Sequence, residues 1–346
     1  MPAISAADAI SPAIQRTRSF LFRPFRFGTY LKLCLVALLT EATTGGSFNS
    51  SFPGRHTSHH ASNISSLPAF AITPAKFAAG IAIFALVALI GLFIYYLITR
   101  LRFAWFHCLV YNIREIRPGW RFYRVPATRF FWFNVVVYLG FLLALGIVLM
   151  PFAAGFVGLF RSLQAGGHPS FGAIFALLLP LIPIFLLFVL AGVAAQIVLR
   201  DLMLPHFAME NASVSSAWNA VWSRIRIEKG GFFVYALLRV LMPIAGAIGI
   251  VIILIIPAVL FILAMVAVEV GLHAAFGHAA LGIFLEVAVG GVAFVLAMLV
   301  FIAAFGPLYT GVRLYALIFY GNRYQLLGER LYPPPPPAQI PAPATP

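Results

Sequence analysis

Long apolar runs dominate the pattern of hydrophobic and polar positions, and short segments between them hold most of the charge. A helix needs about 20 apolar residues to cross roughly 30 Å of hydrocarbon, and only helices and closed barrels satisfy their own backbone there. The runs therefore predict membrane-spanning helices. The first is the weakest, because its uninterrupted apolar core is short and Lys32 stands near its start. We expect six spans, near residues 27–44, 75–101, 130–160, 171–199, 232–268 and 281–320.

The two longest runs leave the number of spans open. At 1.5 Å per residue, residues 232–268 would extend roughly 55 Å, which is more than one crossing requires even with tilt. This run could form two spans hinged near Pro257, or one long helix that protrudes from the bilayer. Splitting both long runs would give eight spans. Six remains the prediction, because it fits the distribution of charge better.

Composition shows that most of the surface must face lipid. Of the 346 residues, 62% are hydrophobic and 9% are charged, against about a quarter charged in soluble domains. This excludes an ordinary soluble domain, and disorder over most of the chain. The net charge of +14 lies mainly in alternate connections between the predicted spans, as the positive-inside rule requires of cytoplasmic loops. We therefore predict a multi-pass protein of the cytoplasmic membrane with both termini inside, and no binding of nucleic acid.

Three basic segments that lead into predicted spans are similar to one another. They end in aromatic clusters at Phe25, Phe130 and Phe232, and arginines lie upstream in every copy. The similarity indicates a threefold repeat of helical hairpins, or only the arginine and aromatic content typical of any segment that enters a membrane from inside. The predicted fold is an all-α polytopic membrane bundle of about six spans, with cytoplasmic amphipathic helices leading into it.

Two of these segments have the period of an amphipathic helix. From Val214 to Ile225 the apolar residues recur at intervals of three and four, and residues 1–26 form a basic amphipathic segment. Such helices can lie on the inner leaflet, where each basic residue adds roughly 1 kcal/mol of attraction to anionic lipid. Packing on the cytoplasmic ends of the bundle is the alternative. The predicted interface anchors are Arg16, Arg18, Trp120, Arg121, Arg124, Trp218, Trp222, Arg224 and Arg226.

Motifs for catalysis are absent: the sequence has no HExxH, no Walker loop and no GxSxG. We expect no enzyme activity, no cofactor and no metal site. Cys34 and Cys108 are isolated in apolar stretches, which favours core packing. Arg239 and Arg313 lie near the inner ends of their spans, where snorkelling explains them without a partner. Several side chains on the predicted outer side could bind a metal or titrate, although scattered solvated residues are the simpler interpretation: His56, His59, His60, His168, His273, His278, Glu41, Glu269 and Glu286.

The stretch 200–238 resembles the recurring signature of a large group of poorly characterised prokaryotic membrane proteins. This group is related to the membrane domain attached to some glycerophosphoryl diester phosphodiesterases. The resemblance implies a six-helix membrane domain with cytoplasmic lead-in helices, and it brings no catalytic residues. The phosphodiesterase barrel itself has no counterpart, since no soluble stretch is long enough. The residues that carry the resemblance are Pro205, Glu210, Ala217, Gly231 and Phe232.

The predicted organisation is a cytoplasmic segment 1–26, a membrane domain 27–328 and a proline-rich tail 333–346 that we expect to be disordered. The expected partners are the lipid bilayer, anionic lipids of the inner leaflet, and another membrane protein or a second copy. The leading hypothesis is a non-enzymatic scaffold, assembly or membrane-organising protein. The alternative is a transporter or channel for a small or lipid-like solute, which would need a cavity that reaches the midplane.

Overall fold

The structure, a computed structural model, describes residues 4–42, 74–164, 170–277 and 279–332, and all its regular elements in these ranges are helices. This confirms the predicted all-α fold. The elements are α1 (Ile10–Phe22), α2 (Phe27–Ala42), α3 (Pro74–Tyr111), α4 (Ile116–Phe122), α5 (Arg124–Gln164), α6 (Phe171–Leu178), α7 (Leu181–Ile197), the π-helix η2 (Val198–Met203), α8 (Leu204–Met209), α9 (Val214–Ile227), α10 (Lys229–Phe276), α11 (Ala280–Gly321) and α12 (Gln325–Leu331).

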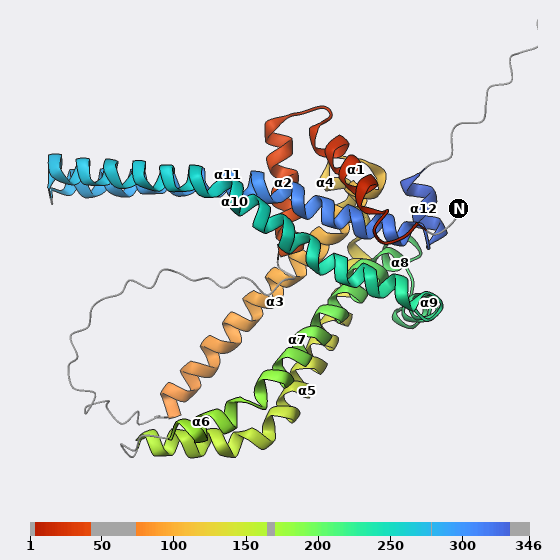
Figure 1. The fold of residues 1–346 in the computed structure, drawn as a ribbon, viewed down its shortest axis with the longest axis horizontal. Helices are drawn as coiled ribbons and strands as arrows, with labels where there is room; N and C mark the ends of the chain where they lie inside the picture. The colour runs from red at the N-terminus through yellow and green to blue at the C-terminus, as the bar shows by residue number, and fades with distance from the viewer. Residues whose placement is uncertain (1–3, 43–73, 165–169, 278, 333–346) are drawn as a thin grey trace, which may run out of the picture.

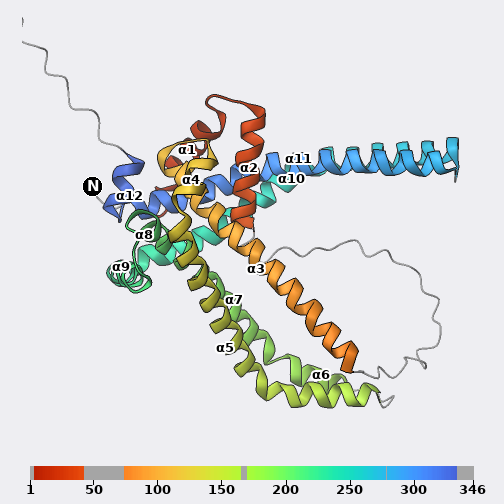
Figure 2. The ribbon, with the colours of Figure 1, turned by 180° about the vertical axis from the view of Figure 1, so that it is seen from behind.

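The molecule consists of a packed hub from which three arms extend (Figures 1 and 2). The hub contains the short helices other than α6 and the adjoining ends of the long ones, and its buried core is richest in residues 103–110, 199–208 and 312–320. The arms are α3 alone, α5 with α6 and α7, and α10 with α11. Almost every described side chain in the arms is exposed or only half-buried, because the arms diverge instead of packing together.

Five helical segments are long and apolar enough to cross a membrane, at Ala78–Tyr111, Arg124–Gln164, Ile174–Met209, Lys229–Phe276 and Ala280–Gly321. The sixth predicted span, near residues 27–44, corresponds to α2, which has 16 residues. At 1.5 Å per residue these 16 residues reach about 24 Å, and the chain after Ala42 lies outside the described residues. The eight-span alternative is also not found, since α10 and α11 are each one continuous helix.

Backbone chemistry explains where the arms break and turn. The predicted span 171–199 is interrupted between α6 and α7, where Pro180 precedes the first residue of α7. Proline cannot donate the backbone hydrogen bond that a continuing helix needs. At the tip of the third arm, α10 ends at Gly277 with φ +57°, a conformation that glycine adopts without steric cost.

The helix α2 crosses α11 at very close range (Figure 1). A Cβ atom on Gly306 would lie only 2.7 Å from the Cα of Cys34, so a glycine is needed at this contact. Nearby, Pro307 has no N–H to bond the carbonyl of Ala303 four residues earlier. The hydroxyl of Tyr30 donates to that carbonyl instead, at 2.7 Å. The crossing therefore depends on a small residue and on a side chain that replaces a missing helix bond.

The order of the elements partly follows the predicted threefold repeat. The lead-in helices α1, α4 and α9 each precede a longer helix, namely α2, α5 and α10. The second and third copies then form antiparallel hairpins, whereas α2 lies across α11 and does not run along α3 (Figure 2). The first copy thus differs from the other two in packing.

Candidate functional site: a buried cluster of arginines and carboxylates

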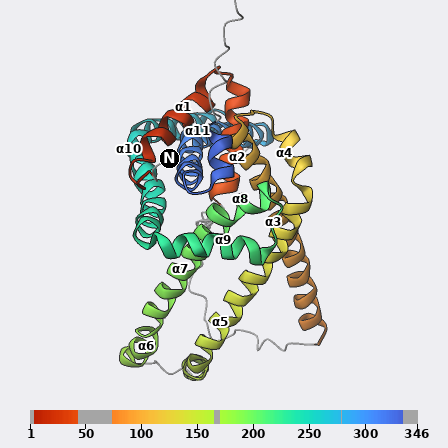
Figure 3. The ribbon, with the colours of Figure 1, turned by 90° about the vertical axis from the view of Figure 1, so that its right-hand side faces the viewer.

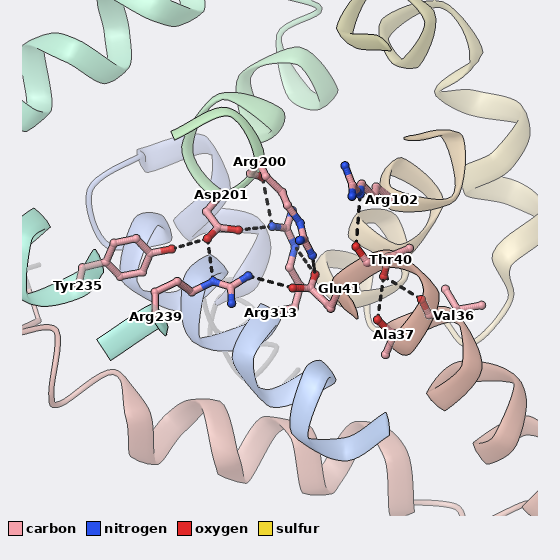
Figure 4. Close-up of polar contacts among 10 residues, drawn as sticks. All are labelled: Val36, Ala37, Thr40, Glu41, Arg102, Arg200, Asp201, Tyr235, Arg239 and Arg313. Atoms are coloured by element: carbon pink, nitrogen blue, oxygen red, sulfur yellow. Dashed lines mark hydrogen bonds and ion pairs between the residues drawn. The ribbon is translucent and has the colours of Figure 1, made fainter. Parts of the chain in front are cut away.

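Five charged side chains from four helical elements meet in the interior of the hub (Figure 4). Only one of them, Arg239, has a side chain that is more than a few per cent exposed, and it is 12% exposed. We call them the ionic cluster: Glu41 from α2, Arg200 and Asp201 from η2, Arg239 from α10 and Arg313 from α11.

Asp201 is the centre of the ionic cluster. One carboxylate oxygen accepts a hydrogen bond from Nη1 of Arg313 at 2.6 Å. The other accepts from Nε of Arg239 at 2.8 Å and from the hydroxyl of Tyr235 at 3.0 Å. Arg313 also donates to the backbone carbonyl of Arg200 at 3.1 Å. Asp201 therefore joins η2 to both helices of the third arm.

Glu41 makes the second bridge. Its carboxylate accepts from Nη2 of Arg239 at 2.9 Å, forms an ion pair with Arg200, and lies 4.0 Å from Nε of Arg313. Next to it, Nε of Arg102 donates to the carbonyl of Thr40 at 3.3 Å, which brings the end of α3 to the same place (Figure 4). The second and third arms and α2 thus converge on two carboxylates, and α3 is bonded to the backbone carbonyl next to Glu41.

Separating the helices of the hub would therefore cost a large amount of free energy. Removing one partner from a buried ion pair typically costs about 3–5 kcal/mol, because the other charge is left uncompensated in a low-dielectric interior. The ionic cluster holds three guanidinium groups against two carboxylates, so neither acid can be lost without exposing a larger buried positive charge. In the described part of the chain, no three His, Cys, Asp or Glu side chains lie close enough to bind a metal ion.

The π-helix η2 places two adjacent charged residues inside this interior. Residues 199–203 are all buried, and the chain continues from α7 through η2 into α8 without a turn. A π-helix widens the backbone locally and is frequently found at functional sites. Here both of the consecutive residues Arg200 and Asp201 take part in the ionic cluster: Arg200 pairs with Glu41, and Asp201 pairs with Arg313 and Arg239.

A second polar group lies at the end of α8. His206 contacts the hydroxyl of Tyr320 at 2.7 Å and the carboxylate of Glu210 at 3.3 Å. Nη1 of Arg224 donates to the same tyrosine hydroxyl at 3.2 Å. Partial burial acts to raise the pKa of Glu210, but the neighbouring polar groups of Tyr324, His206 and Arg224 outweigh it, and the pKa lies below its usual value. This group connects α8, α9 and α11.

The predicted interface anchors separate into exposed and packed residues. On α9 the apolar face is divided, with Ala217 and Val221 buried against the hub and the tryptophans outside. Trp218 and Trp222 are 44% and 41% exposed, and their rings stack at 5.9 Å. The remaining exposed anchors are Arg18, Arg121, Arg124 and Arg226.

Three predicted anchors contact protein groups instead. Arg16 donates to the carbonyls of Leu109 and Leu331, near the ends of α3 and α12. Trp120 lies beneath the guanidinium of Arg100, whose carbon is 4.4 Å from the ring centroid. Arg224 belongs to the group around His206. Because these three residues make hydrogen bonds or ring contacts with other residues of the hub, they stabilise its fold.

A family model described as a family of unknown function (DUF7544) matches residues 4–329. The chain belongs to this family. No curated protein and no solved structure matches the chain. The family match carries no link to the membrane domain attached to glycerophosphoryl diester phosphodiesterases, and that relationship stays a prediction.

The residues that carried the sequence resemblance line one corner of the hub. Pro205 lies in the first turn of α8, Glu210 follows its last residue, and Ala217 is on the buried face of α9. Phe232 is buried edge-on against Phe319. Gly231 lies next to the ion pair between Glu228 and Arg323, in which Nε of Arg323 is 2.8 Å from Oε2 of Glu228. In this family member the motif therefore builds the packing between α8, α9 and α10.

The ionic cluster corrects two sequence predictions. Arg239 and Arg313 were expected to snorkel without partners, but both are paired inside the hub. Glu41 was expected on the outer side, but it lies beside Arg200, at the predicted inner end of another span. Asp201 was not singled out at all. The available signal was an acidic residue inside an otherwise apolar run, since such residues are rare and need partners. Both cysteines are buried, as predicted.

Proposed function

We propose that the protein is a non-enzymatic membrane scaffold: the hub lies at the inner face of the cytoplasmic membrane, and the arms cross the bilayer. The exposed apolar arms support this proposal most directly. Within them the long stretches 77–99, 130–160, 171–199, 240–268 and 287–312 contain no Asp, Glu, Lys or Arg. Surfaces of this kind bind lipid tails or other transmembrane helices.

The distribution of basic residues supports an orientation with the hub on the cytoplasmic side of the membrane. The basic segments predicted to be cytoplasmic supply α1, α4, α9 and α12, and all four belong to the hub. Both ends of the described chain, Ile4 and Tyr332, also lie there. The positive-inside rule places this side in the cytoplasm. Because five crossings alone would leave Ile4 and Tyr332 on opposite sides of the membrane, the proposal requires one more crossing between α1 and α3, a part of the chain in which residues 43–73 lie outside the described residues.

The helix α9 gives the scaffold a contact with the inner leaflet. The exposed Trp218 and Trp222 are residues that favour the boundary between headgroups and tails. Arg226 lies over the ring of Trp222, with its guanidinium carbon 5.4 Å from the centroid, so a cation accompanies the aromatic pair. This combination suits a surface that contains anionic lipid.

Transport is the weaker alternative, because a solute path needs polar groups that replace water. The charged side chains of the described spans gather in the hub or at the tips, and the ionic cluster is bonded internally. A rigid hub with open apolar arms has surfaces on which membrane components can assemble. We therefore favour binding of lipids and transmembrane partners over conduction.

One pair of measurements tests the proposal. Purified protein is placed in vesicles with or without phosphatidylglycerol, and movement of ions, a trapped dye and a fluorescent lipid is recorded against empty vesicles. We expect no acceleration. In parallel, bound phosphatidylglycerol is counted by native mass spectrometry for the parent, for a variant with Trp218→Ala and Trp222→Ala, and for Phe171→Ala, an exposed aromatic control at an arm tip.

We expect the double variant to retain fewer anionic lipids, and the control to match the parent. Protein-dependent movement of any of the three solutes would refute the scaffold and favour transport. Equal lipid retention by all three proteins would refute the role of α9.

A further inference from the structure

A groove of about 1300 Å³ lies on the face of the hub that points away from the arms. Its walls come from α1, the ends of α3, α4 and α8, and α12. The helices α1, α4 and α8 are labelled on the side of the hub that Figure 3 shows. Pockets for small ligands usually enclose about 300–1000 Å³. An open groove of this size is better matched to a peptide segment.

Aromatic side chains line the groove and remain accessible. Tyr111 is 40% exposed, Phe122 is 72% exposed and Tyr332 is 41% exposed. Polar groups of Gln15 and Arg330 lie among them. Aromatic-lined grooves with a few hydrogen-bond donors are the typical receptors for proline-rich segments. A polyproline II helix is already extended and has free carbonyl oxygens, so it binds with little loss of entropy.

The chain itself supplies such a segment at the edge of the groove. Residues 333–346 read PPPPPAQIPAPATP, with no charged residue, and they follow directly on Tyr332. That attachment point is fixed, because Arg16 donates to the carbonyl of Leu331 at 2.7 Å and lies over the ring of Tyr332. Fourteen residues of polyproline II would extend about 43 Å.

We propose that residues 333–346 bind as a polyproline II helix in this groove of their own chain. The exposed aromatic rings contact the proline rings, and Arg330 and Gln15 donate hydrogen bonds to the free carbonyl oxygens. A short tether gives the segment an effective concentration in the millimolar range, so modest contacts suffice to hold it. This proposal concerns the cytoplasmic face and does not depend on the role of the arms.

Photo-crosslinking in the full chain tests the proposal. A benzophenone amino acid replaces Phe122, and protein grown on heavy and on normal isotopes is mixed before irradiation. Mass spectrometry then identifies the crosslinked peptide. We expect it to contain residues 333–346, with both halves carrying the same isotope. The control places the crosslinker at Trp222, an exposed aromatic residue of α9 that does not line the groove.

A second variant separates binding from mere proximity. Pro334→Gly with Pro336→Gly keeps the tether length but removes the stiffness of polyproline II, and we expect the yield at position 122 to fall at least fivefold. Three results would overturn the proposal. These are no crosslink to residues 333–346, a yield that is the same at position 222 or in the glycine variant, and crosslinks between heavy and normal chains, which would place the segment of a second copy in the groove.

Discussion

Neutralising Asp201 should destabilise the whole hub. Asp201→Asn keeps the size of the side chain but removes a negative charge that touches Arg239 at 2.8 Å and Arg313 at 2.6 Å. Asparagine retains one carbonyl oxygen, so it can still accept a hydrogen bond from one guanidinium. It cannot balance the charge of either arginine, and its amide group would then face a cationic donor.

The expected loss of stability follows from how deeply Asp201 and Arg313 are buried. The Asp201 side chain is 1% exposed and that of Arg313 is 2% exposed, so water cannot replace the lost carboxylate. Breaking a buried pair by removing one partner costs about 3–5 kcal/mol. The shift is about 2–4 °C of Tm per kcal/mol for chains of 150–250 residues and smaller for longer chains, so for these 346 residues we expect Tm to fall by roughly 5–15 °C.

Thermal unfolding of the detergent-solubilised protein measures this effect. A thiol-reactive fluorescent dye reports hub opening, because Cys34 and Cys108 are free and buried. The matched control is Glu286→Gln, whose carboxylate pairs with His273 at an exposed arm tip. Exposed pairs contribute about 0–1 kcal/mol, so Tm should barely move.

A charge-compensating variant makes the test sharper. Combining Asp201→Asn with Arg313→Gln removes one charge of each sign, and it should recover part of the lost Tm. If Asp201→Asn shifted Tm no more than the Glu286→Gln control, the buried ionic cluster would not stabilise the hub and the reasoning would be wrong.

Three further predictions concern other parts of the molecule. Gly306→Ala should lower the stability of the protein by about 1–3 kcal/mol, because the new Cβ atom would overlap Cys34. As a control, Gly290→Ala should be neutral or stabilising in the same thermal assay, because no atom lies within 4 Å of the new Cβ. The lowered pKa of Glu210 means that its contribution to stability is present above the unfolded pKa of about 4.3 and is lost as the pH falls through the lower folded value. Glu210→Gln should therefore lose less Tm than the parent on acidification from pH 7, and an equal loss would contradict the assignment. Trp222→Ala should lower the fraction of tryptophan fluorescence that lipids brominated near the headgroup quench, and an unchanged fraction would show that α9 does not touch the membrane.

Regular periodicity made much of the fold predictable from the sequence. The five long helices follow from runs of apolar residues, and α9 begins and ends within two residues of the predicted amphipathic segment. The serine at its start explains this accuracy, because the side chain of Ser213 accepts the N–H of Ser216 and fixes the first turn. A helix cap of this kind involves only residues a few positions apart, so it can be read directly from the sequence.

Tertiary partners could not be predicted in the same way. The hydropathy of α2 is compatible with a span, yet its place depends on Cys34 meeting Gly306 and on Tyr30 reaching the carbonyl that Pro307 leaves free. Those contacts join residues more than 270 positions apart. The ionic cluster could not be predicted for the same reason. In the sequence Glu41 and Asp201 are isolated charges, and their arginine partners are identified only in the folded structure.

The length of the apolar stretches and the divergence of the arms have a common explanation. In α10 the uncharged stretch 240–268 would extend about 44 Å, and in α3 the stretch 77–99 would extend about 35 Å. Upright helices would need only about 30 Å, so these stretches require tilts of about 45° and 30°, or extension beyond the hydrocarbon. Helices that leave one hub at different tilts must separate, as the arms do in Figure 1. The excess length that suggested additional spans is therefore what arms that cross a bilayer at different tilts would require.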